Sequence, residues 1–152
     1  MELWHWHPVF VHFAVALLFT GSVLFIAYAV SRDRAWAPNC LIAACWVFWL
    51  GIVMALFTAV TGLLAYFTVP NINPDSRDAI NDHLGFAVAT ATTYLIMAFF
   101  LWKKQKQNLP PSNAWTGTFV LAIALLLTTG YLGGNLVFVR GVGVTAASSS
   151  LH

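Results

Sequence analysis

The sequence has little charge: 8% of its 152 residues are Asp, Glu, Lys or Arg, whereas 60% are hydrophobic. A soluble domain carries roughly 25% charged residues, so this composition excludes a soluble globular domain. The net charge of +2 gives no basis for nucleic-acid binding. Cysteine is also scarce, and Cys40 and Cys45 lie five residues apart on different faces of a helix, so we expect no disulfide between them.

Several catalytic and cofactor motifs are missing from the chain. It has no Walker sequence, no dinucleotide-binding glycine fingerprint, no nucleophile elbow and no Cys-x-x-Cys-His for covalent haem attachment. No convincing general base or nucleophile stands beside the candidate site described below. We therefore expect an electron-transfer or accessory protein rather than an enzyme.

Four long apolar stretches are present, at about residues 8–30, 40–69, 83–102 and 114–139. About 20 apolar residues span a bilayer as a helix. Proline and small polar residues mark the segments between them, 31–38, 70–82 and 103–112, as loops. The sequence therefore predicts an all-α integral membrane protein, a four-transmembrane-helix up-down bundle forming one domain over residues 1–152.

Basic residues predict the orientation of this bundle. The first and third loops carry five of them, namely Arg32, Arg34, Lys103, Lys104 and Lys106, whereas Arg77 and Arg140 lie on the other side. Lys and Arg are enriched in cytoplasmic loops. We therefore expect both termini and the middle loop to face outward.

The histidines gather at this outer side. His5, His7 and His12 lie at the start of the first span, and His83 opens the third. With Pro8 as the first helical residue, His12 lies about 6 Å inside the membrane rim. A polar ring at that depth needs a partner or a place in the bundle interior.

Helices one and three are diagonal in an up-down bundle, so His12 and His83 are expected to approach each other across its axis. Two imidazoles in that arrangement are the ligands of a low-spin b-type haem. The inward face of the third span would continue from His83 through Ala87, Thr90, Tyr94 and Met97. A packing face with one histidine at the rim is the alternative interpretation of that stripe.

Glycines and arginines complete the predicted haem site. Gly62, Gly130, Gly133 and Gly134 fall near the depth of His12 and leave room for a flat ligand. Their alternative role is close helix packing in lipid. Arg77 and Arg140 are placed to pair with haem propionates, or equally to bind lipid headgroups.

Two other functions fit the same residues. His7, His12 and His83, with Asp82 or Asp78 nearby, are a possible ligand set for one Zn, Cu or Fe ion. The chain could also be a cofactor-free structural or assembly subunit. Its abundant aromatics and small residues would then pack against a larger membrane-protein partner or a second copy of the chain.

Two segments resemble a known family. His7-Pro-Val-Phe-Val-His-Phe13 is similar to an HPxxVHF opening, and Gly130–Val144 is similar to a GxLGGxLVYxxGxGV close. Together they resemble the bacterial membrane family catalogued as domain of unknown function 2231, over essentially the whole chain. The positions that match are His7, His12, His83, Gly133, Gly134, Gly141 and Gly143.

This resemblance implies a four-helix protein of the bacterial inner membrane, in which the orientation predicted from the basic residues makes both termini periplasmic. Fusions of relatives to Rieske or cytochrome c modules imply redox work, as electron carrier or subunit of a larger redox or photosynthetic complex. Ala14 departs from the family pattern, where proline is frequent. Ala65-Tyr66 replaces an acidic-aromatic pair, which removes a carboxylate from the outer site.

Overall fold

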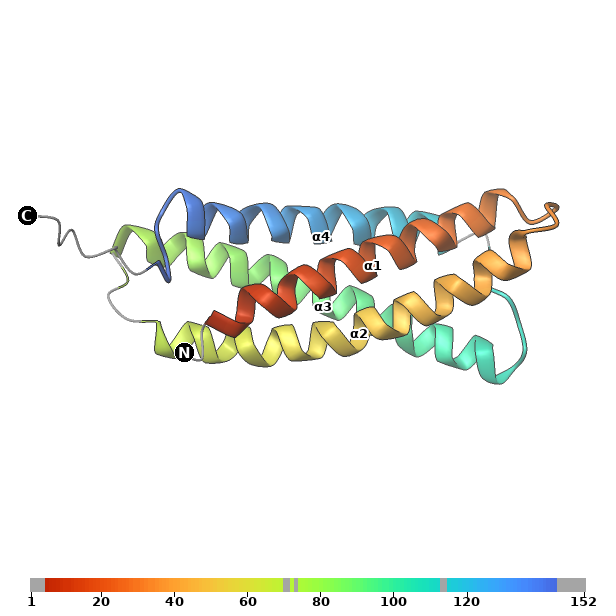
Figure 1. Cartoon of the computed structure of the whole chain (residues 1–152), viewed down its shortest axis with the longest axis horizontal. Coiled ribbons are helices and arrows are strands. Elements are labelled where there is room, and N and C mark those ends of the chain that lie inside the picture. The colour runs from red at the N-terminus through yellow and green to blue at the C-terminus, as the bar shows by residue number, and fades with distance from the viewer. Residues whose placement is uncertain (1–4, 70–71, 73, 113–114, 145–152) are drawn as a thin grey trace, which may run out of the picture.

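The computed structural model describes residues 5–69, 72, 74–112 and 115–144. Four helices run through them: α1 (Trp6–Val30), α2 (Ala37–Thr68), α3 (Pro74–Lys106) and α4 (Trp115–Phe138). Each is long and apolar enough to cross a membrane. They lie side by side as one elongated bundle (Figure 1). This confirms the predicted all-α bundle of four spans.

The start of the third span was predicted wrongly. The loop was expected to continue to Asp82, but α3 begins at Pro74, which makes His83 the tenth helical residue. Proline suits the first position of a helix because the amide hydrogen that it lacks has no partner there. Asp78 follows near the start of the helix, where a negative charge interacts favourably with the helix dipole. The polar residues 74–82 therefore form the first turns of α3, ahead of its apolar stretch.

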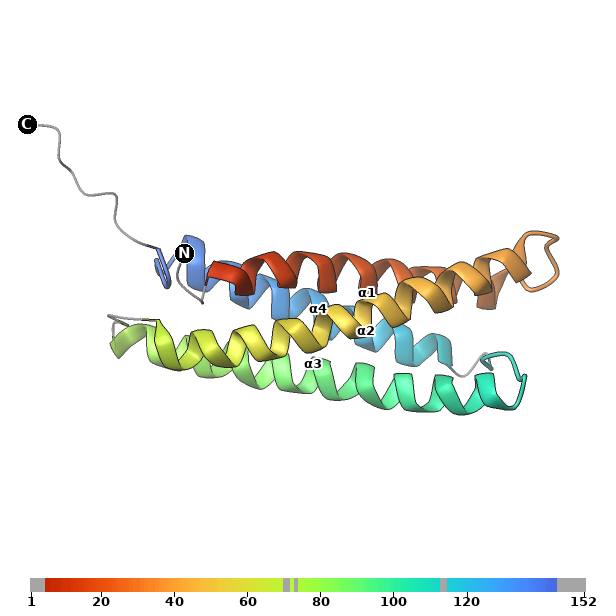
Figure 2. The same cartoon turned by 60° about the horizontal axis from the view of Figure 1, so that its bottom comes forward.

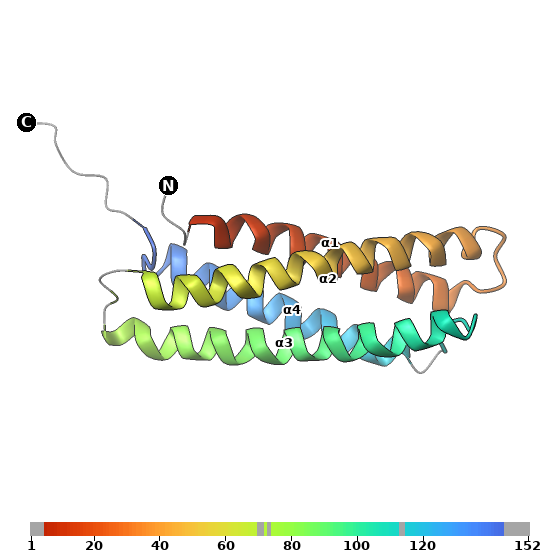
Figure 3. The same cartoon turned by 90° about the horizontal axis from the view of Figure 1, so that it is seen from below.

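The helices are arranged in a ring in chain order. α1 packs most extensively against α2, α3 against α4, and α1 against α4, while α2 and α3 touch least. The turned views show α2 and α3 along one side with α4 behind them (Figures 2 and 3). α1 and α3 are therefore diagonal, as the up-down topology predicts.

The close packing of α1 on α2 depends on two glycines. A Cβ atom on Gly21 would lie 3.1 Å from the backbone of Phe48, and one on Gly51 would lie 2.8 Å from the side chain of Leu18. Small residues let helix backbones approach in a membrane. Gly51 thus has the packing role, and no side chain would fit there without movement of its neighbours.

The two ends of the bundle differ in charge. We call the end with the starts of α1 and α3 the histidine end, and the opposite end, with Lys103, Lys104 and Lys106 in the last turn of α3, the lysine end. The main hydrophobic cluster lies in the middle of the bundle and toward the lysine end, and Ala14, Ile80 and Leu136 are buried nearer the histidine end. In this cluster the rings of Phe25 and Phe119 stack, with their centroids 4.7 Å apart. The ring of Phe48 packs edge-on against both.

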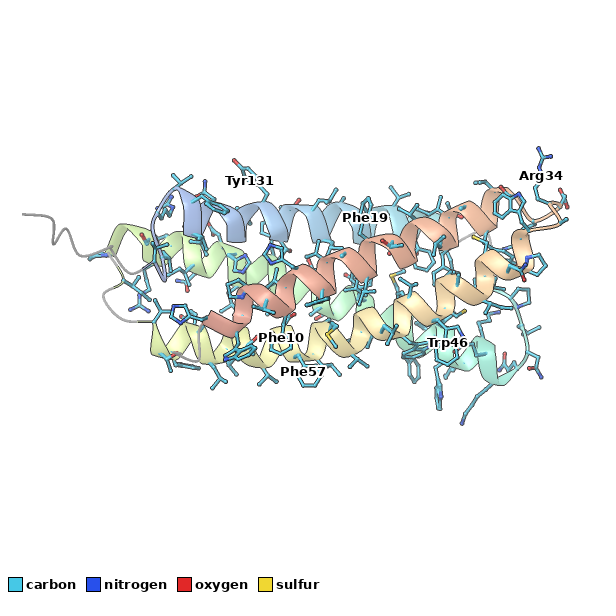
Figure 4. The ribbon with its side chains drawn as sticks, viewed as in Figure 1. Phe10, Phe19, Arg34, Trp46, Phe57 and Tyr131 are labelled. Atoms are coloured by element: carbon cyan, nitrogen blue, oxygen red, sulfur yellow. The ribbon has the colours of Figure 1, made fainter. Side chains whose placement is uncertain are left out.

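The inward stripe of α3 agrees with its sequence pattern. Tyr94 and Met97 are 1% and 3% exposed, and Thr90 is 6% exposed. Large apolar side chains cover the outside, as expected of a surface that meets lipid. Trp46, Phe57 and Tyr131 point away from the bundle (Figure 4).

Glycines also shape the turn that follows α4. Gly141 and Gly143 have φ values of 65° and 75°, a conformation that glycine adopts without steric cost. The turn is closed by the amide of Val142, which donates to the carbonyl of Leu136 over 2.9 Å. These two positions of the closing motif thus have a backbone role. At the other end of the bundle, Cys40 and Cys45 are both free.

Candidate functional site at the histidine end

His7 is held in place by α2. Its Nδ1 atom lies 3.2 Å from the carbonyl oxygen of Thr58 and 3.4 Å from Oγ1 of Thr61. A carbonyl only accepts hydrogen bonds, so Nδ1 carries the hydrogen and donates it. In the neutral ring this leaves Nε2 with its lone pair, the form in which histidine binds a metal.

The ring of His7 rests on Gly62. A Cβ atom at Gly62 would lie 2.8 Å from Cε1 of His7, which is closer than side chains pack. Glycine at this position of α2 is therefore what allows the imidazole to lie where it does. The sequence predicted that Gly62 leaves room for a flat ligand, and in the structure the group against Gly62 is the imidazole of His7.

His83 repeats this arrangement between the other two helices. A Cβ atom at Gly133 of α4 would lie 3.0 Å from Cε1 of His83. The Nδ1 atom of His83 is buried and has no partner at hydrogen-bonding geometry, while the backbone of Thr129 is the polar group beside the ring. A buried polar atom without a good partner is costly, and such atoms often belong to functional sites.

The two histidines lie at the same end of the bundle. His7 comes from α1 and His83 from α3, the diagonal helices, and both lie at the histidine end of the bundle. Each ring lies over a glycine of the helix that follows its own in the chain. The result is a pair of imidazoles at one level of the bundle, both half-buried.

His12 does not join this pair. Its side chain is exposed, and its Nδ1 atom lies 2.5 Å from the carbonyl oxygen of Pro8, one turn back in the same helix. Five residues correspond to about 140° of rotation around a helix. Because His7 points at α2, His12 is directed to a different face.

The predicted metal triad is therefore not assembled as His7, His12 and His83. Among the described residues, no three His, Cys, Asp or Glu side chains lie at a spacing that suits one metal ion. Asp78 and Asp82 are both exposed on α3.

Four further residues were predicted for the site: Gly130, Gly134, Arg77 and Arg140. A Cβ atom at Gly130 or Gly134 would meet nothing within 4 Å, so these glycines contact neither imidazole. Arg77 and Arg140 both lie at the histidine end and are exposed.

Three threonines of the site went unrecognised in the sequence. Thr58 and Thr61 contact His7, and Thr129 lies beside His83. The sequence contains little indication of their role, because the hydroxyl of a single threonine in an apolar span often bonds only to a carbonyl of its own helix. Thr58 and Thr61 do this as well, bonding the carbonyls of Met54 and Phe57. Their closeness to Gly62 was the available clue.

The family comparison adds an identification at this point. The sequence model of DUF2231, described as a predicted membrane protein, matches residues 5–146. The chain belongs to the DUF2231 family. The match includes both histidines of the pair and both glycines under them, and it agrees with the four apolar spans. No curated protein and no solved structure matches the chain.

Proposed function

We propose that this DUF2231 protein is a small b-type cytochrome-like membrane protein that holds one haem with His7 and His83. It would carry electrons or serve as a subunit of a larger redox complex. The observation that supports this most is the pair of imidazoles from diagonal helices, each resting on a glycine. Helical bundles bind haem through such histidine pairs.

The number of ligands favours haem over a bare metal ion. A porphyrin supplies four nitrogen ligands, so two imidazoles complete the coordination of its iron. A zinc ion needs three or four protein ligands. The described residues bring two histidines together here and no third His, Cys, Asp or Glu.

The residues around the pair have clear tasks in this proposal. The Thr58 carbonyl accepts from Nδ1 of His7 and orients its ring, so Nε2 would be the atom that holds the iron. Gly62 and Gly133 keep space for the two rings. Arg77 and Arg140, at the same end, carry the charge opposite to that of the haem propionates. Bound haem would supply one-electron redox chemistry.

The spectrum of the purified protein tests this function. Protein made in haem-replete cells and purified in mild detergent is expected to show a Soret band, and sharp α and β bands after reduction. The measurement is a reduced-minus-oxidised spectrum with haem quantified per chain. A colourless protein that contains zinc, copper or iron would contradict the haem proposal and indicate a metal-ion site instead. A colourless and metal-free protein would favour the structural subunit.

The site is proposed to face the periplasm, with the chain in the bacterial inner membrane. Five of the seven Lys and Arg residues lie at the lysine end, and basic loops stay in the cytoplasm. A reporter fused after His152 is expected to be active in the periplasm, and one inserted at Gln107 to be active in the cytoplasm. The reverse activities would place the histidine pair at the cytoplasmic face.

A further inference from the structure

The outer face of α3 changes from apolar to cationic toward the lysine end. Six residues at helical spacing form it, on the side of α3 opposite the buried Tyr94, Met97 and Leu101. We call it the outer α3 face; its members are Leu95, Ile96, Phe99, Trp102, Lys103 and Lys106. The four apolar side chains are 43% to 53% exposed, and both lysines are exposed as well. Aliphatic side chains are thus followed by aromatic rings and then by ammonium groups, along the edge of the bundle that α3 forms (Figure 3).

The two lysines of the outer α3 face are positioned by aromatic rings of the same helix. Nζ of Lys103 lies 4.7 Å from the ring centroid of Phe99, and Nζ of Lys106 lies 4.2 Å from that of Trp102. The two rings also pack on each other, with their centroids 6.2 Å apart. An ammonium group over an aromatic ring is attracted by the negative charge of the ring face. These contacts keep both ammonium groups on the outward side of α3, at the end of its apolar stretch.

Neither ammonium group has a carboxylate partner in the part of the chain that the structure describes. Asp78 and Asp82 lie at the histidine end, and the exposed Asp33 lies in the loop between α1 and α2. Like charges one turn apart on a helix repel each other. An anion that reaches both Lys103 and Lys106 is therefore attracted by two positive charges, and on the outward side of a membrane-spanning helix the available anions are lipid phosphates.

We propose that the outer α3 face binds one anionic phospholipid. Its phosphate lies between the ammonium groups of Lys103 and Lys106, which donate hydrogen bonds to the phosphate oxygens. Its acyl chains lie along the aromatic and aliphatic side chains of the same face, in the order in which a phospholipid presents these groups. Lysines next to a membrane span attract anionic lipids, whereas a zwitterionic phospholipid brings no net charge to them. This site lies at the lysine end, and its lipid is bound whether or not the histidine pair holds haem.

Lipid binding to the purified protein tests this site. The full chain in mild detergent is titrated with phosphatidylglycerol or with phosphatidylcholine of the same acyl chains, and the affinity for the first bound lipid is measured by native mass spectrometry. One lysine beside an anionic lipid corresponds to about fivefold in affinity. Lys103→Gln/Lys106→Gln is therefore expected to weaken phosphatidylglycerol binding about 25-fold and to leave phosphatidylcholine binding unchanged. Inorganic phosphate is expected not to displace the lipid, because the acyl chains contribute to its binding.

A matched variant, Arg34→Gln/Lys104→Gln, removes the same charge from the same end but spares the outer α3 face. Arg34 is exposed in the first loop (Figure 4). Lys104 is half-buried and lies about 100° from Lys103 around α3. It also lies in the last turn, so it shares the interaction of Lys103 with the negative end of the helix dipole. This variant is expected to bind phosphatidylglycerol as tightly as the parent protein does.

Three results would overturn the site. Equal losses in the two double variants would show that the net charge of this end attracts the lipid without a particular face. Equal binding of both lipids by the parent would show no preference for an anionic headgroup, and displacement by inorganic phosphate would show an anion site that needs no lipid. All four substitutions replace half-buried or exposed side chains, and the unfolding temperature of each variant in detergent checks that its fold is kept.

Discussion

His7→Ala and His83→Ala are each expected to abolish the low-spin haem spectrum, with complete loss of the sharp α and β bands. Each substitution would remove one of the two imidazoles proposed to hold the haem iron, and one imidazole alone would not give the low-spin spectrum. The His7 ring is already oriented by the Thr58 carbonyl, 3.2 Å from its Nδ1 atom. The measurement is the reduced spectrum of each purified variant, normalised to protein.

His12→Ala is the matched control for this experiment. It removes a histidine from the same helix, but one whose ring is exposed and directed at the Pro8 carbonyl. The variant is expected to keep the haem content and spectrum of the parent protein. If His12→Ala loses the spectrum while His7→Ala keeps it, the ligand pair would be His12 and His83 and the assignment from the structure would fail.

The fold was predictable because its signals are long and redundant. Four apolar stretches of bilayer length require four helices, and short loops require neighbours to run in opposite directions. The diagonal relation of α1 and α3 follows from that order alone. The inward face of α3 was also predictable, because Thr90, Tyr94 and Met97 recur at helical spacing after His83.

The choice between His7 and His12 needed information that the sequence does not supply clearly. Depth in the membrane favoured His12, which lies further along the helix. In the structure the rotation of α1 about its own axis turns His7 toward α2 and leaves His12 exposed, and this rotation goes with the α1–α2 contacts at Gly21, Gly51 and Gly62. An apolar helix has no polar face from which to infer its rotation. The first turn also begins at Trp6, so His7 lies inside the helix rather than at its cap.

The sequence likewise does not show which glycine of α4 contacts a neighbouring helix. Gly130, Gly133 and Gly134 form one cluster in the sequence, and nothing there indicates which of them faces a neighbour. In the structure Gly133 meets His83, whereas Gly130 and Gly134 face open space. Neighbouring residues differ by about 100° around a helix, so Gly133 and Gly134 face different directions, and Gly130 lies about one turn away from both along the axis.

Gly62→Ala and Gly133→Ala are expected to remove most of the bound haem while leaving the folded bundle intact. The new methyl carbon would lie 2.8 Å from Cε1 of His7 in the first variant and 3.0 Å from Cε1 of His83 in the second. The atom in the way is the end of a side chain, which can turn aside at little cost in stability. The same turn would take the imidazole away from the position in which it is proposed to hold haem. Haem per chain and the temperature of unfolding in detergent are measured together.

Two matched variants separate loss of the site from loss of packing. Gly134→Ala, next to Gly133, would meet nothing within 4 Å, so haem content and stability should both remain those of the parent. Gly51→Ala would place its methyl carbon 2.8 Å from Cδ2 and 3.0 Å from the backbone nitrogen of Leu18. Overpacking of this kind costs about 1–3 kcal/mol, so this variant should unfold at a lower temperature and still bind haem in its folded form. If Gly133→Ala and Gly62→Ala lowered the unfolding temperature as Gly51→Ala does, with haem content unchanged, their glycines would serve helix packing alone. The histidines above them would then not be ligands in the orientation that the structure gives them.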